Sequence, residues 1–165
     1  MGLTLVTGAS GFVGSHLMTE MTRRGLPVRG VTRATLPGLM TIASYGPETN
    51  WSTCLQGVDA VVHLAARVHV IRDTADDPLA LFREANVTAT INLARQAAAA
   101  GVRRFVFVSS IKVNGEHTEP GKPFTADDPP DPQDPYGLSK AEAEAALMAL
   151  GRETGMEMTV IRPPL

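Results

Sequence analysis

Cysteine is nearly absent from this sequence, which holds a single one, Cys54, in 165 residues. One thiol excludes a disulfide within the chain, and the four histidines are scattered without the spacing of a metal site, so we expect no metal. A chain without disulfides fits a reducing compartment, and we expect it in the cytoplasm. Cys54 has no neighbouring base in the sequence, so we interpret it as a buried or half-buried filler rather than a nucleophile.

Neither sign of charge is in excess, and long hydrophobic runs are missing. The 15 basic and 17 acidic side chains give a net charge of −2, which argues against nucleic acid or an anionic membrane as the main partner. No stretch could span a bilayer, and the opening MGLTLVTGAS lacks the charged leader and the longer apolar run of a signal peptide. The length and the 44 % hydrophobic composition predict one domain with one core.

Short apolar runs alternate with amphipathic segments of helical length, and this rhythm predicts a parallel sheet with crossover helices. The strands are apolar almost throughout, so both faces of the sheet should be covered. Right-handed crossovers then predict a doubly wound, Rossmann-type α/β fold with strand order 3-2-1-4-5-6. The predicted strands are 3–6, 28–32, 40–44 (the weakest), 60–65, 104–110 and 158–162, and the predicted helices are 12–24, 78–100 and 136–154.

The segment 119–135 is the one compositionally biased stretch. Its six prolines prevent regular structure and its acidic residues keep it hydrated, so we predict a solvated loop rather than a metal site. Gly101 and Gly155 follow predicted helices and are natural helix stops.

A glycine-rich turn, TGASGFVGSHL, joins the first predicted strand to the first predicted helix. It places Gly8, Gly11 and Gly14 three residues apart. Between a strand and a helix, such glycines permit a tight turn, close approach of a pyrophosphate and tight helix packing. The start of the helix adds free N–H groups and a positive dipole end, so the turn predicts a dinucleotide site.

A tyrosine and a lysine lie four residues apart in DPYGLSK, at the start of the last predicted helix. Residues four apart share one helix face, so Tyr136 and Lys140 should point into the same space. A nearby positive charge lowers the pKa of a phenol, which would let Tyr136 transfer a proton near neutral pH. Taken alone, the pair does not decide the matter, and a solvated helix is then the favoured interpretation.

Five motifs in this order resemble the extended branch of the short-chain dehydrogenase/reductase superfamily, the nucleotide-sugar epimerases, dehydratases and reductases. The motifs are TGASGFVG, HLAA at 63–66, the serine pair before VNG at 109–115, YGLSK and RPP at 162–164. The resemblance covers nearly the whole chain. It implies that Tyr136 and Lys140 are catalytic and that Ser110, with Ser109 as the second choice, supplies the hydroxyl that completes the triad.

The resemblance also implies how an NAD or NADP molecule would be held. Lys140 would contact its ribose, residues 64–66 would line it, and Asn86 would brace the preceding strand, whereas His63 and Arg162 can equally be packed strand-end residues. The predicted cofactor-binding residues are Gly8, Ser10, Gly11, Phe12, Val13, Gly14, Thr32, Arg33, Leu64, Ala65, Ala66, Ser109, Tyr136 and Lys140.

Several departures from the family pattern narrow the chemistry. Dehydrating members carry an Asp-Glu pair directly after the triad hydroxyl; Ile111 and Lys112 stand here, so dehydration is disfavoured. Asn114 replaces the usual tyrosine of V-Y-G. Thr32 and Arg33 stand where NAD-binding members place an acid against the ribose, and near Ser44 the usual adenine-binding aspartate is missing. An acid at position 32 would repel a 2′-phosphate, and an arginine can bind one, so we expect a preference for NADP.

The resemblance favours an epimerase or 4-keto reductase acting on a nucleoside-diphosphate sugar, most like enzymes that act on UDP-N-acetyl sugars, on the wording HLAARVHV and SSIKVNGE. A reductase of small carbonyl compounds and a non-catalytic nucleotide sensor are the alternatives. The family also implies a homodimer through the helices 78–100 and 136–154. It further implies a smaller C-terminal substrate domain, so we expect residues 1–165 to be the dinucleotide-binding domain alone.

Overall fold

Six parallel strands form one sheet in the order β3-β2-β1-β4-β5-β6. The computed structural model describes residues 2–68 and 77–164. In the centre of the sheet Val6 lies opposite Gly30 on one side and Val62 on the other. The strands are β1 Leu3–Thr7, β2 Val28–Thr32, β3 Met40–Thr41, β4 Val58–His63, β5 Arg104–Val108 and β6 Glu157–Ile161. The predicted Rossmann-type fold and strand order are confirmed.

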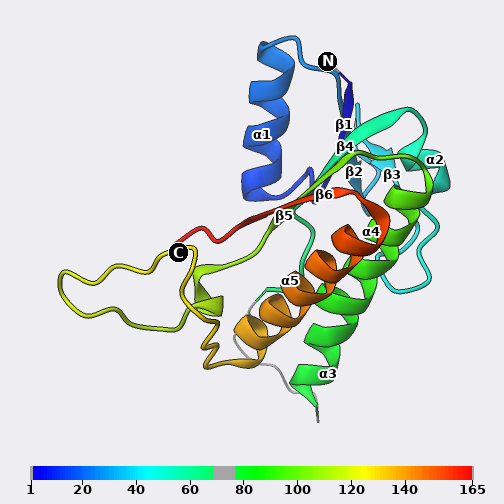
Figure 1. Ribbon diagram of the computed structural model, residues 1–165. Coiled ribbons are helices and arrows are strands. Elements are labelled where there is room, and N and C mark those ends of the chain that lie inside the picture. The colour runs from blue at the N-terminus through cyan, green and yellow to red at the C-terminus, as the bar shows by residue number, and fades with distance from the viewer. Residues whose placement is uncertain (1, 69–76, 165) are drawn as a thin grey trace.

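The helices cover the two faces of this sheet unequally. Among the described residues, α1 stands alone on one face, while α3, α4 and α5 lie together on the other (Figure 1). The helical elements are α1 Phe12–Arg23, α2 Ser52–Leu55, α3 Pro78–Phe82, the π-helix η1 Arg83–Thr88, α4 Ala89–Ala99, the 3₁₀-helix η2 Ile111–Val113 and α5 Pro135–Thr154.

The core lies between the sheet and the helices α4 and α5. Phe105 and Phe107 of β5 are buried there in one cluster with Leu93 of α4 and Leu147 of α5. Side chains alternate between the two faces of a strand, so the neighbours of these phenylalanines face the side of α1. That face is less covered, and Ile161 of β6 is 47 % exposed on it.

Several element boundaries differ from the prediction for local physical reasons. β4 begins two residues early, directly after the left-handed turn at Gly57, and it ends at His63 because the next backbone N–H groups turn to a side chain of β1. β5 stops before Ser110, which caps η2. The predicted helix 78–100 is continuous over 78–99 but contains the π-helix η1. The stops at Gly101 and Gly155 are confirmed, both with positive φ.

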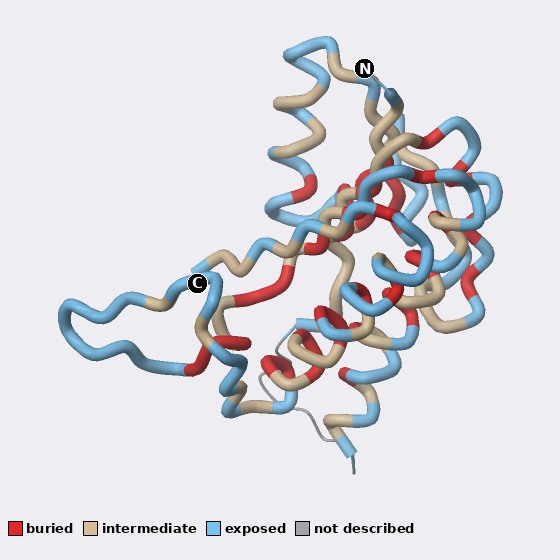
Figure 2. The backbone as a smooth tube through the Cα atoms, in the orientation of Figure 1, coloured by how far each residue is buried: buried red, intermediate tan, exposed pale blue. Residues whose placement is uncertain are grey.

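The loop between η2 and α5 projects from the body of the molecule and is largely exposed (Figures 1 and 2). It contains one isolated antiparallel bridge, Glu119 to Lys122, in agreement with its prediction as an irregular loop. No helix in the part of the chain that the structure describes is both long and apolar enough to cross a membrane. His69 and Val70 of the HLAARVHV motif lie outside the described residues.

Candidate active site

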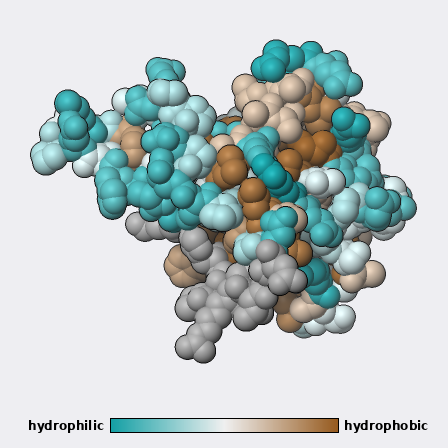
Figure 3. Space-filling view, turned by 90° about the horizontal axis from the view of Figure 1, so that it is seen from below, coloured by the Kyte–Doolittle hydropathy of each residue, from teal (hydrophilic) through white to brown (hydrophobic). Residues whose placement is uncertain are grey.

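A groove of about 680 Å³ runs along the carboxyl ends of β1, β2 and β4. In parallel α/β sheets ligands bind outside this edge, where the strand order reverses. Seen from below, on the side of α3 and the start of α5, apolar surface gathers near the centre of the molecule beside the hydrophilic projecting loop (Figure 3). The groove is lined by eight of the predicted cofactor-binding residues, Gly8, Ser10, Gly11, Thr32, Arg33, Leu64, Ala65 and Ala66.

The glycine turn is packed so tightly that it has no room for side chains. A Cβ atom on Gly14 would lie 2.1 Å from the Gly8 carbonyl oxygen, and one on Gly8 would lie 2.9 Å from the Ala65 nitrogen. Gly8 also has a φ of +66°, which favours glycine. Gly11 precedes α1 and offers no capping side chain, so the N–H groups of the first helical turn are left for an anionic ligand. The chain's own geometry therefore fits a dinucleotide here.

Phe12 and Val13, also predicted as cofactor-binding, are not among the residues that line the groove. Their side chains are 84 % and 55 % exposed at the start of α1. A contact with a cofactor at these two positions would therefore come from the backbone N–H groups, and their assignment stays a prediction.

The end of β2 is joined to the glycine turn by two hydroxyl groups. Ser10 Oγ and Thr32 Oγ1 lie 3.1 Å apart, and the Ala34 backbone N–H donates to Thr32 Oγ1 at 3.2 Å. Arg33 is exposed beside them and, within the described residues, has no ion-pair partner. An exposed guanidinium at the rim of the groove is available to a phosphate group.

His63 is a packed strand-end residue that organises the floor of the groove. The Thr7 hydroxyl oxygen accepts hydrogen bonds from the backbone N–H groups of Leu64 and Ala65, both at 3.3 Å, so its own proton is donated to His63 Nδ1 at 2.6 Å. The imidazole proton therefore sits on Nε2, which lies 3.0 Å from Thr90 Oγ1 and 3.1 Å from the Tyr45 hydroxyl. Burial, with repulsion from Lys140 as a smaller cause, lowers the pKa of His63 to about 3.

Ser110 and Tyr136 are brought together although they are 26 residues apart in the sequence. Ser110 caps η2, where its Oγ accepts the Lys112 backbone N–H at 3.2 Å. Tyr136, in the first turn of α5, is 9 % exposed and packs edge-on against Phe82 of α3. Burial raises the pKa of Tyr136, and a hydrogen bond with Ser110 partly lowers it. Leu81, the residue before Phe82, lines the groove, but Tyr136 and Ser110 are not themselves among the residues that line it.

Lys140 lies one turn further along α5 and is almost completely buried, at 1 % exposed. Its Nζ donates to the Val108 carbonyl at 2.8 Å and lies 4.0 Å from the centre of the Phe107 ring. Burial lowers its pKa to about 7, with Glu144 as a weaker opposing influence. Ser109 is also buried, and its hydroxyl has no hydrogen-bond partner among the described residues, which leaves it available to a bound group.

Asn86 lies in the π-helix and clamps the loop after β4 to α5. Its Oδ1 accepts the Arg67 backbone N–H at 2.8 Å, and its Nδ2 donates to the Arg67 carbonyl and to Ser139 Oγ, both at 3.0 Å. Ser139 Oγ in turn donates to the Tyr136 carbonyl at 2.7 Å. π-Bulges recur at functional sites, and here the bulge links residues that line the groove to the helix of Tyr136.

Arg162 is a hydrogen-bonded strand-end residue rather than a group that faces the groove. Its Nη2 donates to Glu144 Oε2 at 2.6 Å, and its Nη1 donates to Asn114 Oδ1 at 3.0 Å. Asn114, the replacement for the family's usual tyrosine, is thus held by an arginine and donates on to the Thr125 carbonyl at 3.4 Å.

Two aromatic residues that the sequence analysis did not assign, Tyr45 and Trp51, also line the groove. They pack edge-on with ring centres 6.3 Å apart. Burial raises the pKa of Tyr45 to about 12, so this phenol stays protonated. Their rarity as aromatic residues, 5 % of the chain, does not distinguish them from the other aromatic side chains, so the sequence held no specific signal for these two.

The geometry agrees with comparisons to known proteins. Residues 4–165 match the model of the NAD dependent epimerase/dehydratase family, and the chain belongs to that family. It is 43 % identical to a UDP-glucose 4-epimerase of Vibrio cholerae over 166 residues, which cover 98 % of this chain and 51 % of that protein.

Two solved structures that contain bound ligands are also similar to this chain. MoeE5 in complex with UDP-glucose and NAD is 36 % identical with a TM-score of 0.81, over 96 % of this chain and 52 % of that one. RMD from Pseudomonas aeruginosa, complexed with NADPH, is 29 % identical with a TM-score of 0.79, over 99 % and 53 %. The chain spans about half the length of the relatives it matches.

Proposed function

We propose that this chain forms the dinucleotide-binding and catalytic part of an NAD(P)-dependent enzyme that epimerises or reduces a nucleoside-diphosphate sugar. The observation that carries the proposal is the pairing of the Ser110 and Tyr136 hydroxyls at the carboxyl edge of the same sheet, with Lys140 buried one turn along the same helix as Tyr136. The similarity to a UDP-glucose 4-epimerase supports epimerisation.

In the proposed reaction, different residues of the chain have different roles. A bound nicotinamide supplies a hydride acceptor or donor. Tyr136 Oη takes the proton from the sugar hydroxyl that is oxidised, or returns one to the keto oxygen, and Ser110 Oγ hydrogen-bonds the same oxygen. Lys140, whose Nζ donates to the Val108 carbonyl, would hold the cofactor ribose. The small side chains of Ala65 and Ala66 line the groove, and the buried Ser109 hydroxyl has no partner among the described residues.

Dehydration is a weaker candidate. Expelling water from a sugar needs an acid and a base beside the triad hydroxyl. Ile111 is apolar, and the Lys112 ammonium is engaged by two carboxylates, Glu116 and Asp134. The residues after Ser110 therefore offer no free carboxyl group.

The finer assignments are part of the same proposal. We take the substrate to be a UDP-sugar, with UDP-N-acetyl sugars as the preferred class from the sequence motifs. We take the cofactor to be NADP rather than NAD because Arg33 is exposed beside Thr32 and has no ion-pair partner among the residues that the structure describes. The alternatives remain a reductase of small carbonyl compounds and a nucleotide sensor. Retention of both Tyr136 and Lys140 favours catalysis over sensing.

Substitution of Tyr136 tests the proposal. Tyr136→Phe removes only the transferable proton, so we expect turnover of UDP-glucose, or of a UDP-N-acetyl sugar, to fall by about 10²–10⁴-fold in the whole enzyme. Cofactor affinity, measured by calorimetry, should change little. The control is Tyr45→Phe, the other tyrosine, which lines the groove but should leave kcat nearly unchanged. A Tyr136→Phe enzyme that keeps more than a tenth of its turnover would refute the assignment.

A further inference from the structure

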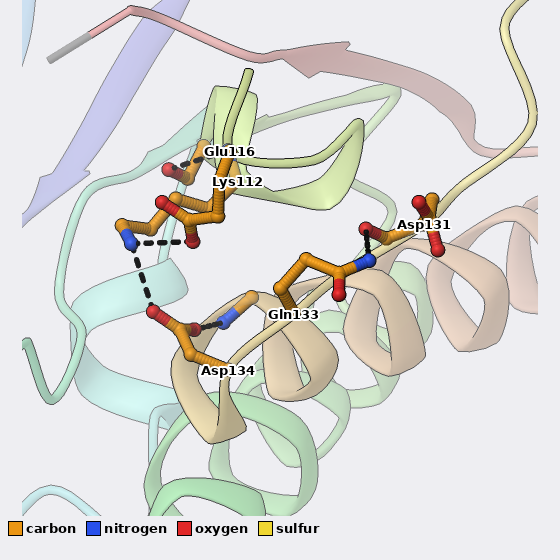
Figure 4. A network of polar contacts seen from close by, with 7 residues as sticks. Lys112, Glu116, Asp131, Gln133 and Asp134 are labelled. Carbon is orange, nitrogen blue, oxygen red and sulfur yellow. Dashed lines mark hydrogen bonds and ion pairs between the residues drawn. The ribbon is translucent and has the colours of Figure 1, made fainter.

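Lys112 joins three segments at the entrance to α5. From η2, its Nζ donates to Glu116 Oε1 at 2.7 Å and to Asp134 Oδ2 at 2.9 Å (Figure 4). The Lys112 and Asp134 side chains are only 17 % and 21 % exposed. The Lys122–Glu119 pair of the projecting loop, at 77 % and 73 % exposed, is by contrast an ordinary surface pair of little energetic consequence.

Asp134 is shared between this ion pair and the first turn of α5. While Oδ2 accepts from Lys112, Oδ1 accepts the Gly137 backbone N–H at 2.6 Å, which makes Asp134 the N-cap of the helix. Tyr136 is the second residue of that helix. The Lys112 ammonium therefore holds the Asp134 carboxylate, and this carboxylate in turn holds the first turn of α5, where Tyr136 lies.

The backbone of Lys112 holds the other half of the hydroxyl pair. Its N–H donates to Ser110 Oγ at 3.2 Å. Its carbonyl oxygen packs on Gly137 so closely that a Cβ there would lie 2.8 Å away. One residue thus contacts the Ser110 hydroxyl through its backbone and the start of the Tyr136 helix through both its carbonyl and its ammonium.

The charges around the phenol explain why the ammonium matters. Burial is the main cause that raises the pKa of Tyr136 and the Ser110 hydrogen bond the main one that lowers it; the Asp134 carboxylate adds a smaller rise and the Lys112 ammonium a smaller fall. Of the other charged groups nearby, Glu116 pairs with Lys112, Lys140 lies one turn along α5, and the Arg67 guanidinium lies over the Phe82 ring. Removal of the Lys112 ammonium would take away this opposing influence on the pKa of the phenol.

We propose that Lys112 is a positioning residue for Tyr136: its ammonium neutralises Asp134 beside the phenol and ties the first turn of α5 to the 3₁₀-helix that Ser110 caps. The inference rests on the proposed role of Tyr136 in proton transfer. It gives a role to Lys112, the basic residue two positions after Ser110, where dehydrating members of the family carry an acid.

Titration of the tyrosines tests this without any substrate. The chain has two tyrosines, and burial raises the pKa of Tyr45 to about 12, so the Tyr136→Phe variant identifies the Tyr136 step in the ultraviolet absorbance of tyrosinate. Lys112→Met should move that step to higher pH, and Lys112→Arg should leave it near the parent. In the whole enzyme, the limb of the pH profile of turnover that Tyr136 sets should move in the same direction.

Two further variants separate charge from structure. Asp134→Asn keeps an N-capping side chain but removes the charge, so it should lower the Tyr136 midpoint, and the double variant with Lys112→Met should return toward the parent. Lys122→Met is the matched control and should change nothing. If Lys112→Met leaves the tyrosinate midpoint and the pH profile of turnover unmoved, or if Lys122→Met moves them equally, the proposal is overturned. Absence of sugar turnover would instead contradict the proposed function and leave the titration readable.

Discussion

At the scale of single residues, the candidate site contains two basic groups that folding buries at a cost. Lys140 and His63 are both almost inaccessible, and burial lowers their pKa values to about 7 and about 3. His63 compensates with hydrogen bonds to Thr7 and to Thr90 or Tyr45. Lys140 has the Val108 carbonyl and the Phe107 ring, which is a sparse environment for an ammonium group.

Because burial of Lys140 is costly, we expect that replacing it raises the stability of the fold while it removes the activity that the lysine supports. Between pH 7 and the ordinary lysine pKa of 10.5, the unfolded chain binds a proton at this residue that the folded chain releases, so the free energy of unfolding should rise with pH in that window. Lys140→Met removes this linkage. The variant should be more stable than the parent at pH 7, by ~2 kcal/mol or more, since one pKa unit corresponds to about 1.4 kcal/mol.

Urea unfolding between pH 6.5 and pH 9 would measure the effect, the limits being chosen to span about half of the window. Lys122→Met, the substitution of a lysine that is 77 % exposed, is the control and should follow the parent. A Lys140→Met variant that is less stable than the parent at pH 7 would show that the buried amine is not a net cost.

Site residues that lie close together in the sequence could be predicted from the sequence alone. Contacts between residues that are far apart in the sequence could not. The glycine spacing and the Tyr136–Lys140 interval are local patterns set by turn and helix geometry. By contrast, His63 meets Thr7 across 56 residues and Lys112 meets Asp134 across 22, and no local periodicity encodes such pairs. Tyr45 and Trp51 were missed for the same reason, because folding alone places them beside the groove.

At the scale of elements, hydrophobic periodicity located the strands and helices but not their interruptions. β2 matches its predicted range, 28–32, because apolar residues and a proline mark its limits. The π-helix η1 was not predicted, since its extra residue arises where Asn86 turns inward to bind the Arg67 backbone and Ser139. A side-chain requirement from another part of the fold therefore overrode the regular helical repeat.

The outer surfaces of α4 and α5 are the surfaces through which we expect two copies of the chain to form a homodimer. Ala145, Met148 and Ala149 of α5 and Ala99 of α4 are exposed, and small residues permit close packing of helices. We expect light scattering at micromolar concentration to give twice the chain mass. Met148→Glu would place a charge in the contact and should shift the protein to monomer.

The control for this prediction is Leu36→Glu, which changes another exposed apolar residue in the loop after β2. Leu36→Glu should remain dimeric. A parent protein that is monomeric throughout the concentration range, or a Met148→Glu variant that stays dimeric, would contradict this interface.

At the scale of the whole molecule, one edge of the sheet gathers all the groups of the candidate site. The glycine turn, the ends of β2 and β4, η2 and the start of α5 meet there because parallel strands all present their carboxyl ends to the same side. The fold class followed from the alternation of apolar and amphipathic segments. The unequal coverage of the two sheet faces by helices could not be predicted in this way, because the strands are apolar on both sides whether or not helices cover them.

The most direct test of the central claim is calorimetric titration of this protein with NADH and NADPH. We expect saturable one-to-one binding of both dinucleotides, tighter for NADPH. Arg33→Glu should reverse this preference because the guanidinium would no longer meet a 2′-phosphate. Absence of saturable binding by either dinucleotide would contradict the assignment of the groove.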